Sequence, residues 1–261
     1  MTEVAHTFAD SDAYERFMGR WSRAVGPQFL DWVSAPTSAN WLDVGCGTGI
    51  LTELIFEHCT PAAVFGIDPQ RAQIEYAKRQ PIAQRATLRV ANAEALPFSD
   101  AAFDVVASAL AINFVADRAR AASEMRRVAR PGGIVAGFVW DFEAEQSPSW
   151  PLRVTMRKCG AEVPGIPGTD ASSLRALTAL FEEAGLHFVE TTTMEVTLSY
   201  QDFDAFLDAQ TPSYSPTTRV IAAMSARERE KLLKLVRAAL PTNRDGAIEY
   251  AALANAVKAR V

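Results

Sequence analysis

The sequence predicts an α/β protein whose doubly wound, mostly parallel sheet carries helices on both faces. Two observations predict this fold. Between Asn40 and Trp140, short apolar runs that end at turn residues alternate with stretches of helical periodicity. A glycine-rich turn, residues 45–49, joins the first apolar run to the first helical stretch. Alternation of this kind requires right-handed crossovers, which leave the strands parallel and the helices on either face.

The first half of the chain contains a helix followed by buried strands. Apolar residues follow helical spacing from Tyr14 to Phe29, and Pro27 predicts an interruption of that helix. Continuous apolar runs suit strands that are buried on both faces. The expected strands are residues 41–44, 63–67, 86–91, 103–109 and 134–140. The helical stretches between them are residues 51–58, 71–79 and 118–129.

After Trp140 the alternation loosens, and prolines and glycines break the chain into shorter pieces. One helix is expected at residues 152–159, another ends at Gly185, and a β-branched run at residues 187–198 is typical of a strand. A helical block at residues 202–240 is broken at residues 211–216, and Ser225 with Glu228 forms a capping box. Residues 247–260 predict a last strand, antiparallel to the others, although their alanine content leaves a helix open.

Composition limits the class of protein. Hydrophobic residues make up 49% of the chain and charged residues 22%, which is typical of a globular protein. No apolar run approaches the roughly 20 residues needed to span a bilayer, and the N-terminus lacks the order of a signal peptide, so we expect a cytoplasmic protein without membrane insertion. Three dispersed cysteines indicate neither a disulfide framework nor a metal site. A net charge of −5 argues against nucleic acid, although a local basic groove stays open.

The glycine turn is the strongest functional signal. Glycines let the backbone turn sharply and approach a ligand closely at the carboxyl end of a strand. The spacing is Gly-x-Gly-x-Gly, with Ile50 where a dinucleotide fingerprint has its third glycine, and no Walker lysine follows. Asp68 ends the second strand about 20 residues further on, where a carboxylate accepts hydrogen bonds from ribose hydroxyls. The turn and the acid together predict a nucleoside-type ligand.

These residues resemble class I S-adenosylmethionine-dependent methyltransferases, which have a Rossmann-like fold. The resemblance is greatest for the branch of ubiquinone and menaquinone biosynthesis C-methyltransferases. It covers about residues 14–140. The matching segments are Leu42-Asp43-Val44-Gly45-Cys46-Gly47-Thr48-Gly49, Gly66-Ile67-Asp68-Pro69, Asn92-Ala93-Glu94-Ala95-Leu96-Pro97-Phe98, Phe103-Asp104-Val105-Val106, Ala111-Ile112-Asn113-Phe114, Glu124-Met125-Arg126-Arg127-Val128 and Arg130-Pro131-Gly132-Gly133.

The resemblance implies roles for particular residues in binding S-adenosylmethionine, whose product is S-adenosylhomocysteine. Backbone groups of Gly45, Cys46 and Gly47, together with Asp43, would hold the methionine end. Asp68 would hold the ribose. The adenine would lie between Pro69 and Gln70 on one side and Ala93 and Glu94 on the other. The carbonyl of Ala109 would accept from the methionine ammonium. Asn92 stands where the family often has Asp, which weakens one contact with the adenine amino group.

Candidate catalytic residues follow the fourth and fifth strands. Asn113 would orient a polar substrate, Phe114 would pack on the sulfonium, and Asp141 is our candidate general base. Loop capping and core packing are the alternatives for Asn113 and Phe114, and a solvated carboxylate is the alternative for Asp141. Tyr14 would bring the N-terminal helix over the cofactor, unless it belongs to a plain core stripe. The histidines, His6, His58 and His187, are not expected at the strand carboxyl ends.

The expected organisation is a single domain, residues 1–261. It has an N-terminal helical lid (1–34), a cofactor-binding core (35–141), cap insertions (142–168 and 201–245) and the remainder of the core (169–200 and 246–261). The cap residues Trp150, Met156, Phe203, Phe206 and Tyr214 favour a pocket for a small, partly apolar molecule.

We therefore expect methyl transfer to a small, partly apolar molecule by in-line displacement, with no metal, by a monomer or homodimer. The alternatives are a cofactor-binding regulatory protein without catalysis, a tRNA or protein methyltransferase, and a nicotinamide-dependent oxidoreductase, which the loop spacing disfavours. The basic pair Arg126 and Arg127 offers a mutational test for nucleic-acid binding.

Overall fold

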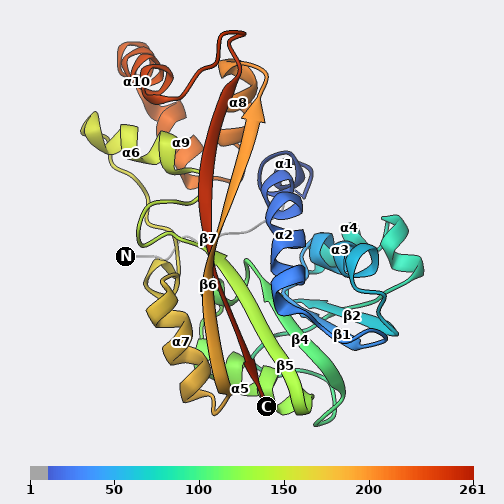
Figure 1. Ribbon diagram of the computed structural model, residues 1–261. Helices are drawn as coiled ribbons and strands as arrows, with labels where there is room; N and C mark the ends of the chain where they lie inside the picture. The colour runs from blue at the N-terminus through green and yellow to red at the C-terminus, as the bar shows by residue number, and fades with distance from the viewer. Residues whose placement is uncertain (1–10) are drawn as a thin grey trace.

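A seven-stranded sheet forms the centre of the molecule in the computed structural model, which describes residues 11–261 (Figure 1). His6 therefore lies outside the described residues. The strand order is β3-β2-β1-β4-β5-β7-β6. The strands are β1 (Asn40–Val44), β2 (Ala63–Asp68), β3 (Thr87–Val90), β4 (Phe103–Ala109), β5 (Ala129–Trp140), β6 (His187–Tyr200) and β7 (Ile248–Arg260). The predicted doubly wound sheet is confirmed.

The direction of the strands locates the ligand-binding edge. β1 pairs in parallel with β2 on one side and with β4 on the other, so the strand order reverses between β1 and β4. The crevice outside the carboxyl ends of two such strands is where open α/β sheets bind ligands. β7 runs antiparallel to both β5 and β6, which confirms the single antiparallel strand. The helix alternative for residues 247–260 is wrong: Ala252, Ala254 and Ala256 of β7 are buried in one core, and Val257 and Ala259 in the core on the other face of the sheet.

Helices cover both faces of the sheet. The helices are α1 (Ser11–Tyr14), α2 (Arg20–Val33), α3 (Ile50–His58), α4 (Arg71–Ala77), α5 (Arg118–Val128), α6 (Trp150–Lys158), α7 (Leu174–Glu183), α8 (Phe203–Gln210), α9 (Pro216–Ala223) and α10 (Ala226–Ala239). Side chains of α2 and α3 pack in one hydrophobic core and those of α5 and α7 in another. The two groups of helices lie on opposite sides of the sheet (Figure 1).

The predicted interruption at Pro27 is wrong. α2 continues through Pro27 to Val33, and the irregular turn lies earlier, where residues 15–19 form a π-helical turn. Proline removes one backbone hydrogen bond from a helix. Trp21, Val25 and Phe29 are fully buried on the core face of α2, so tertiary packing holds the helix together despite that loss.

The cap lies beyond the carboxyl ends of the parallel strands. β6 and β7 extend past the other strands, and α6, α8, α9 and α10 gather around that extension (Figure 1). Buried aromatic residues connect the cap to the N-terminal helix. The Trp21 indole N–H donates to the Tyr200 hydroxyl at 3.1 Å, and the Tyr200 ring stacks on Tyr250. The capping box of Ser225 and Glu228 at the start of α10 is confirmed.

Candidate active site

The glycine turn after β1 brings backbone close to the carboxyl end of β2. The N–H groups of Gly45 and Cys46 both donate to the carbonyl of Ile67, at 2.8 and 2.9 Å. Gly45 has a φ of 79°, and a Cβ there would lie 2.3 Å from the Cβ of Ala111. Gly47 also has a positive φ, 52°, but a Cβ there would meet nothing within 4 Å. Gly45 is therefore needed for packing, whereas Gly47 borders open space.

Asp68 links the two turns at this edge. Its Oδ2 accepts from the Gly47 N–H at 3.0 Å and its Oδ1 from the Gln70 N–H at 2.8 Å. Burial raises the pKa of Asp68, and the two backbone donors partly oppose that rise. A carboxylate offers about four lone-pair directions, so both oxygens keep acceptor capacity for a ligand hydroxyl.

Asp43 lies deeper, inside β1. Its Oδ2 accepts from the Thr52 hydroxyl at 2.7 Å, whereas its Oδ1 is buried without a hydrogen-bond partner among the described residues. Burial raises the pKa of Asp43 to about 7, and the negative charge of Asp68 adds to the rise. A small space of about 40 Å³ beside Asp43 is also lined by Cys46. The Cys46 thiol is buried, and it packs with Ile74 and Leu88, as a space-filling role requires.

A cavity of about 610 Å³ opens at the carboxyl ends of β1 and β4 and continues beneath the cap. All but three of the site residues predicted from the sequence line it. The lining includes Tyr14, Gly45, Gly47, Asp68, Pro69, Gln70, Asn92, Ala93, Glu94, Ala109, Asn113 and Phe114. The exceptions are Asp43, Cys46 and Asp141. Asp43 and Cys46 lie directly behind the cavity, around the smaller space.

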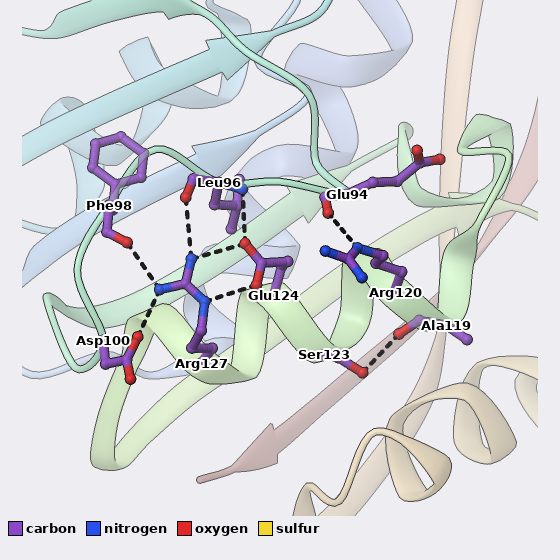
Figure 2. A network of polar contacts seen from close by, with 9 residues as sticks. All are labelled: Glu94, Leu96, Phe98, Asp100, Ala119, Arg120, Ser123, Glu124 and Arg127. Carbon is purple, nitrogen blue, oxygen red and sulfur yellow. Dashed lines mark hydrogen bonds and ion pairs between the residues drawn. The ribbon is translucent and has the colours of Figure 1, made fainter.

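The segment of residues 92–98, part of which the resemblance places beside an adenine, is held by α5 (Figure 2). Arg127 donates to the carbonyls of Leu96 and Phe98 and forms ion pairs with Glu124 and Asp100. Arg120 donates to the carbonyl of Glu94 at 2.9 Å. The predicted segment at residues 124–128 therefore acts by fixing a loop that borders the cavity.

Asn92 has a local role in that segment. Its Oδ1 accepts from the Glu94 N–H at 3.1 Å, and its amide nitrogen donates to the Glu94 carboxylate at 3.4 Å. A second oxygen of Glu94 accepts from the Asp117 N–H. Because Asn92 shapes the turn with the same amide oxygen that the adenine would use, the two interactions share one acceptor.

Asn113 and Phe114 lie in a short 3-10 turn, Ile112–Phe114, directly after β4. The Asn113 side chain is 1% exposed, and neither its amide oxygen nor its amide nitrogen has a hydrogen-bond partner among the described residues. Buried polar groups are rarely left unpaired, so the role of Asn113 as a ligand contact stays a prediction that this burial supports. Phe114 makes an edge contact with Phe142. Enclosure raises the pKa of Tyr14 above its ordinary range, so its phenol is neutral.

The structure does not bring Asp141 to the cavity. Its Oδ1 accepts from the Ala144 N–H at 3.0 Å, and its backbone N–H donates to the carbonyl of Leu253. The carboxylate thus caps a turn directly after β5, while the neighbouring Trp140 and Phe142 line the cavity. Sequence spacing placed Asp141 at the correct edge but could not fix the direction of its side chain.

The cap contributes residues that sequence reasoning missed. Arg153 and Gln210 line the cavity, and neither stands in a motif. Of the five cap residues expected in the pocket, Tyr214 lines the cavity, whereas Met156, Phe203 and Phe206 are buried in the core. Trp150 packs against that core and donates to the carbonyl of Ala251. Apolar residues on short helices are ambiguous because the same pattern suits a core or a pocket.

Neither a metal centre nor a membrane segment is found in residues 11–261. Their His, Cys, Asp and Glu side chains form no group of three or more that could hold a metal ion. No helix in that range has both the length and the apolar character needed to cross a bilayer. His58 lies at the end of α3 and His187 at the start of β6, and neither lines the cavity.

The glycine turn lies at the switch point of a doubly wound sheet, and an acid ends the next strand. This arrangement is typical of enzymes that bind a cofactor containing a nucleoside. A family described as Methyltransferase domain matches residues 42–137. The uncharacterized methyltransferase Mb3374 of Mycobacterium bovis is 32% identical over 232 residues, which cover 88% of this chain and 84% of that protein. The chain belongs to the S-adenosylmethionine-dependent methyltransferases, and S-adenosylmethionine is its cofactor.

A curated relative matches a shorter span, and a solved structure matches the fold. The ubiquinone/menaquinone biosynthesis C-methyltransferase UbiE of Geobacter sulfurreducens is 38% identical over 97 residues, 35% of this chain and 38% of that enzyme. The match thus spans about two fifths of the enzyme's length. The phosphoethanolamine N-methyltransferase 2 of Haemonchus contortus, solved with S-adenosyl-L-methionine, has a TM-score of 0.58 at 19% identity. That match covers 99% of this chain and 58% of the other. This likeness shows the fold alone.

Proposed function

We propose that this protein transfers a methyl group from S-adenosylmethionine to a small, partly apolar molecule by direct in-line displacement. The observation that carries the proposal is the continuity of one cavity from the cofactor residues into the cap. Its cofactor end is lined by Gly47, Asp68 and Glu94, and its cap end by Trp140, Phe142, Leu152 and Tyr214. A cavity of this size and lining suits a small molecule next to a cofactor.

The residues present fit the cofactor. The open space beside Gly47 forms a cradle for a ligand, and a Cβ on residue 47 would enter it. The Asp68 carboxylate lies next to this cradle, because it accepts a hydrogen bond from the Gly47 N–H. Asp68 would hold the ribose hydroxyls. The Oδ1 of Asp43, which accepts from no described residue, lies behind the turn, where the resemblance places the methionine end. Charge and hydrogen-bonding capacity thus match the groups expected at each position.

When bound, S-adenosylmethionine supplies an activated methyl: a bond forms from the acceptor atom to this carbon, the S–CH₃ bond breaks, and its electron pair stays on sulfur. The chain's own contribution is to hold the acceptor in line and to exclude water. Trp140, Phe142 and Leu152 form apolar walls at the cap end. The Asn113 amide, which has no partner within the described part of the chain, would orient the acceptor.

The described cavity lining offers no obvious general base at its cap end. Its carboxylates, Asp68 and Glu94, belong to the ribose and adenine side, and Tyr14 is a neutral phenol. Asp141 as a base stays a prediction that its turn-capping position does not favour. The lining therefore suits an acceptor that attacks without prior proton removal inside the cavity.

The experiment that tests the proposal begins with calorimetric titration of the pure protein with S-adenosylmethionine and S-adenosylhomocysteine. We expect binding of both ligands, and its absence at millimolar ligand would overturn the proposal. Labelled S-adenosylmethionine is then incubated with a panel of small acceptors, and methylated products are identified by mass spectrometry. Binding without transfer to any acceptor would favour a regulatory protein instead.

Replacing the pair Arg126 and Arg127, as the sequence suggested, is not a clean test for a nucleic-acid substrate. Arg127 is engaged with Glu124, Asp100 and two backbone carbonyls, so replacing it would disturb the segment of residues 92–98 whatever the substrate. The exposed Arg126 is the informative position. We expect the variant Arg126→Ala to keep full activity on a small acceptor. Loss of activity on tRNA alone would point to nucleic acid.

A further inference from the structure

The cap places in the cavity wall one cation that has no carboxylate partner among residues 11–261. Arg153 lies on α6 and lines the cavity, where it is the only lysine or arginine among the described lining residues. Its Nη2 donates to the carbonyl of Pro164 at 2.7 Å and its Nη1 to the hydroxyl of Thr217 at 3.2 Å. Both acceptors are neutral, and no described Asp or Glu forms an ion pair with Arg153.

This arrangement differs from that of a neighbouring arginine on the same helix. Arg157 lies four residues further along α6, is exposed, and forms an ion pair with Glu145. Arg153 is more enclosed, and burial alone lowers its pKa. A guanidinium remains charged in proteins and has five N–H donors, of which the two contacts above use two. Enclosing a cation without a nearby anion costs free energy. A negatively charged ligand group beside Arg153 would therefore be stabilised.

One further polar side chain from the cap lines the same cavity in a fixed orientation. Gln210 lines the wall and is 3% exposed. Its amide nitrogen donates to the carbonyl of Pro148 and to the Tyr250 hydroxyl, which fixes the amide orientation. Its carbonyl oxygen has no hydrogen-bond partner among the described residues. The cap therefore presents a cation and a hydrogen-bond acceptor beside the apolar walls of Trp140 and Leu152.

We propose that Arg153 anchors the carboxylate of the methyl acceptor, which is a small organic acid with an apolar body. This inference rests on the proposed function and names its substrate class. A guanidinium fork binds a carboxylate through two parallel hydrogen bonds. One cation matches a monoanion, whereas a dianionic phosphate ester would call for further cationic groups. The apolar walls fit the rest of such a molecule.

The experiment measures binding of matched acid and amide probes to the protein saturated with S-adenosylhomocysteine. The probes are 4-phenylbutyrate and decanoate, each beside its primary amide, with 4-phenylbutyl phosphate as the dianion. In the wild type we expect at least one acid to bind about tenfold or more tightly than its amide. Arg153→Gln removes this preference while affinity for S-adenosylhomocysteine stays within about threefold. Arg157→Gln, the matched control on the same helix, keeps the preference.

A second variant separates anchoring from support of the cap. Thr217→Val removes one hydrogen bond of Arg153 but leaves its charge, so we expect the acid preference to persist. Equal binding of acid and amide by the wild type, or a preference that survives Arg153→Gln, would overturn the proposal. Loss of the acid preference in Thr217→Val would assign Arg153 a structural role. Tighter binding of 4-phenylbutyl phosphate than of 4-phenylbutyrate would overturn the assignment of a monoanionic acceptor. Failure of S-adenosylhomocysteine itself to bind would instead contradict the proposed function.

Discussion

The carboxylate of Glu124 on α5 accepts the backbone N–H of Leu96 at 2.8 Å across the surface of the sheet. The same carboxylate forms an ion pair with Arg127, whose N–H groups reach the carbonyls of Leu96 and Phe98 (Figure 2). The arginine holds the pKa of Glu124 below its usual range. A helix that does not line the cavity thereby fixes a segment whose first residues, Asn92 to Glu94, do line it.

The first prediction concerns this link. Glu124→Ala removes the acceptor of the Leu96 N–H and one of the two carboxylates that pair with the Arg127 guanidinium. We expect a loss of about 1–3 kcal/mol in the free energy of unfolding and a several-fold weaker affinity for S-adenosylhomocysteine. Urea denaturation and calorimetry measure the two effects. Arg126→Ala, at an exposed neighbouring position, should change neither. A loss of stability with unchanged affinity would show that the segment does not need this support to bind the cofactor.

The second prediction separates folding from binding at the glycine turn. Gly47→Ala has room for its Cβ, so it should fold with a loss of about 1–2 kcal/mol from the positive φ. The added methyl enters the cavity, and affinity for S-adenosylhomocysteine should fall by at least about tenfold. Gly132→Ala is the control because it has a φ of 75° and equal room but lies outside the cavity lining. If both variants bound S-adenosylhomocysteine with similar affinity, the space beside Gly47 would not be part of the cofactor site.

The third prediction concerns the buried amide of Asn113, which has no hydrogen-bond partner among the described residues. Asn113→Leu replaces two buried unpaired polar atoms by apolar ones, so we expect stability to rise by about 1 kcal/mol while acceptor turnover falls. Asn255 is the matched control, since it is buried, donates to the Ser172 carbonyl and accepts from the Thr193 hydroxyl. Asn255→Leu should destabilise the protein by about 2–4 kcal/mol. Destabilisation by both variants would remove the case for Asn113 as a ligand contact.

The sequence predicts those parts of the fold that are determined by residues close together in the chain. Continuous apolar runs and the glycine turn identify the strands up to Trp140, because a buried parallel strand admits few polar residues. The same physics places Asp68 at the carboxyl end of β2. The motif containing Glu124 is recognisable from the sequence, but its role as a brace for Leu96 depends on tertiary contact.

Other features depend on side-chain direction and packing, which a single sequence does not specify. Asp141 follows β5 as expected, yet it caps its own turn at Ala144. Arg153 resembles any surface arginine on an amphipathic helix, and only the closure of the cap over α6 places it in the cavity. Pro27 is a local helix breaker that the buried face of α2 overrides.

The last prediction concerns the pH dependence of stability caused by Asp43. Its pKa is about 7 in the folded protein, against about 3.9 for an unperturbed aspartate. Between these values the unfolded chain has lost the proton that the folded protein keeps. Stability therefore falls as pH rises from about 4 to 7 and stays reduced above pH 7. Asp43→Asn lacks this dependence, so it should gain up to about 4 kcal/mol relative to the wild type across that range.

Urea denaturation of both proteins at pH 4.5 to 8 measures this difference, and a constant difference would contradict the raised pKa. Cofactor binding provides an independent readout. A ligand ammonium near Asp43 favours the ionised carboxylate, so binding of S-adenosylhomocysteine near pH 6.5 should release a proton and tighten as pH rises toward 7. Calorimetry in two buffers of different ionisation enthalpy detects that proton. Asp43→Asn should release none, because an amide does not ionise in this pH range. Equal release in both proteins would place the titrating group elsewhere.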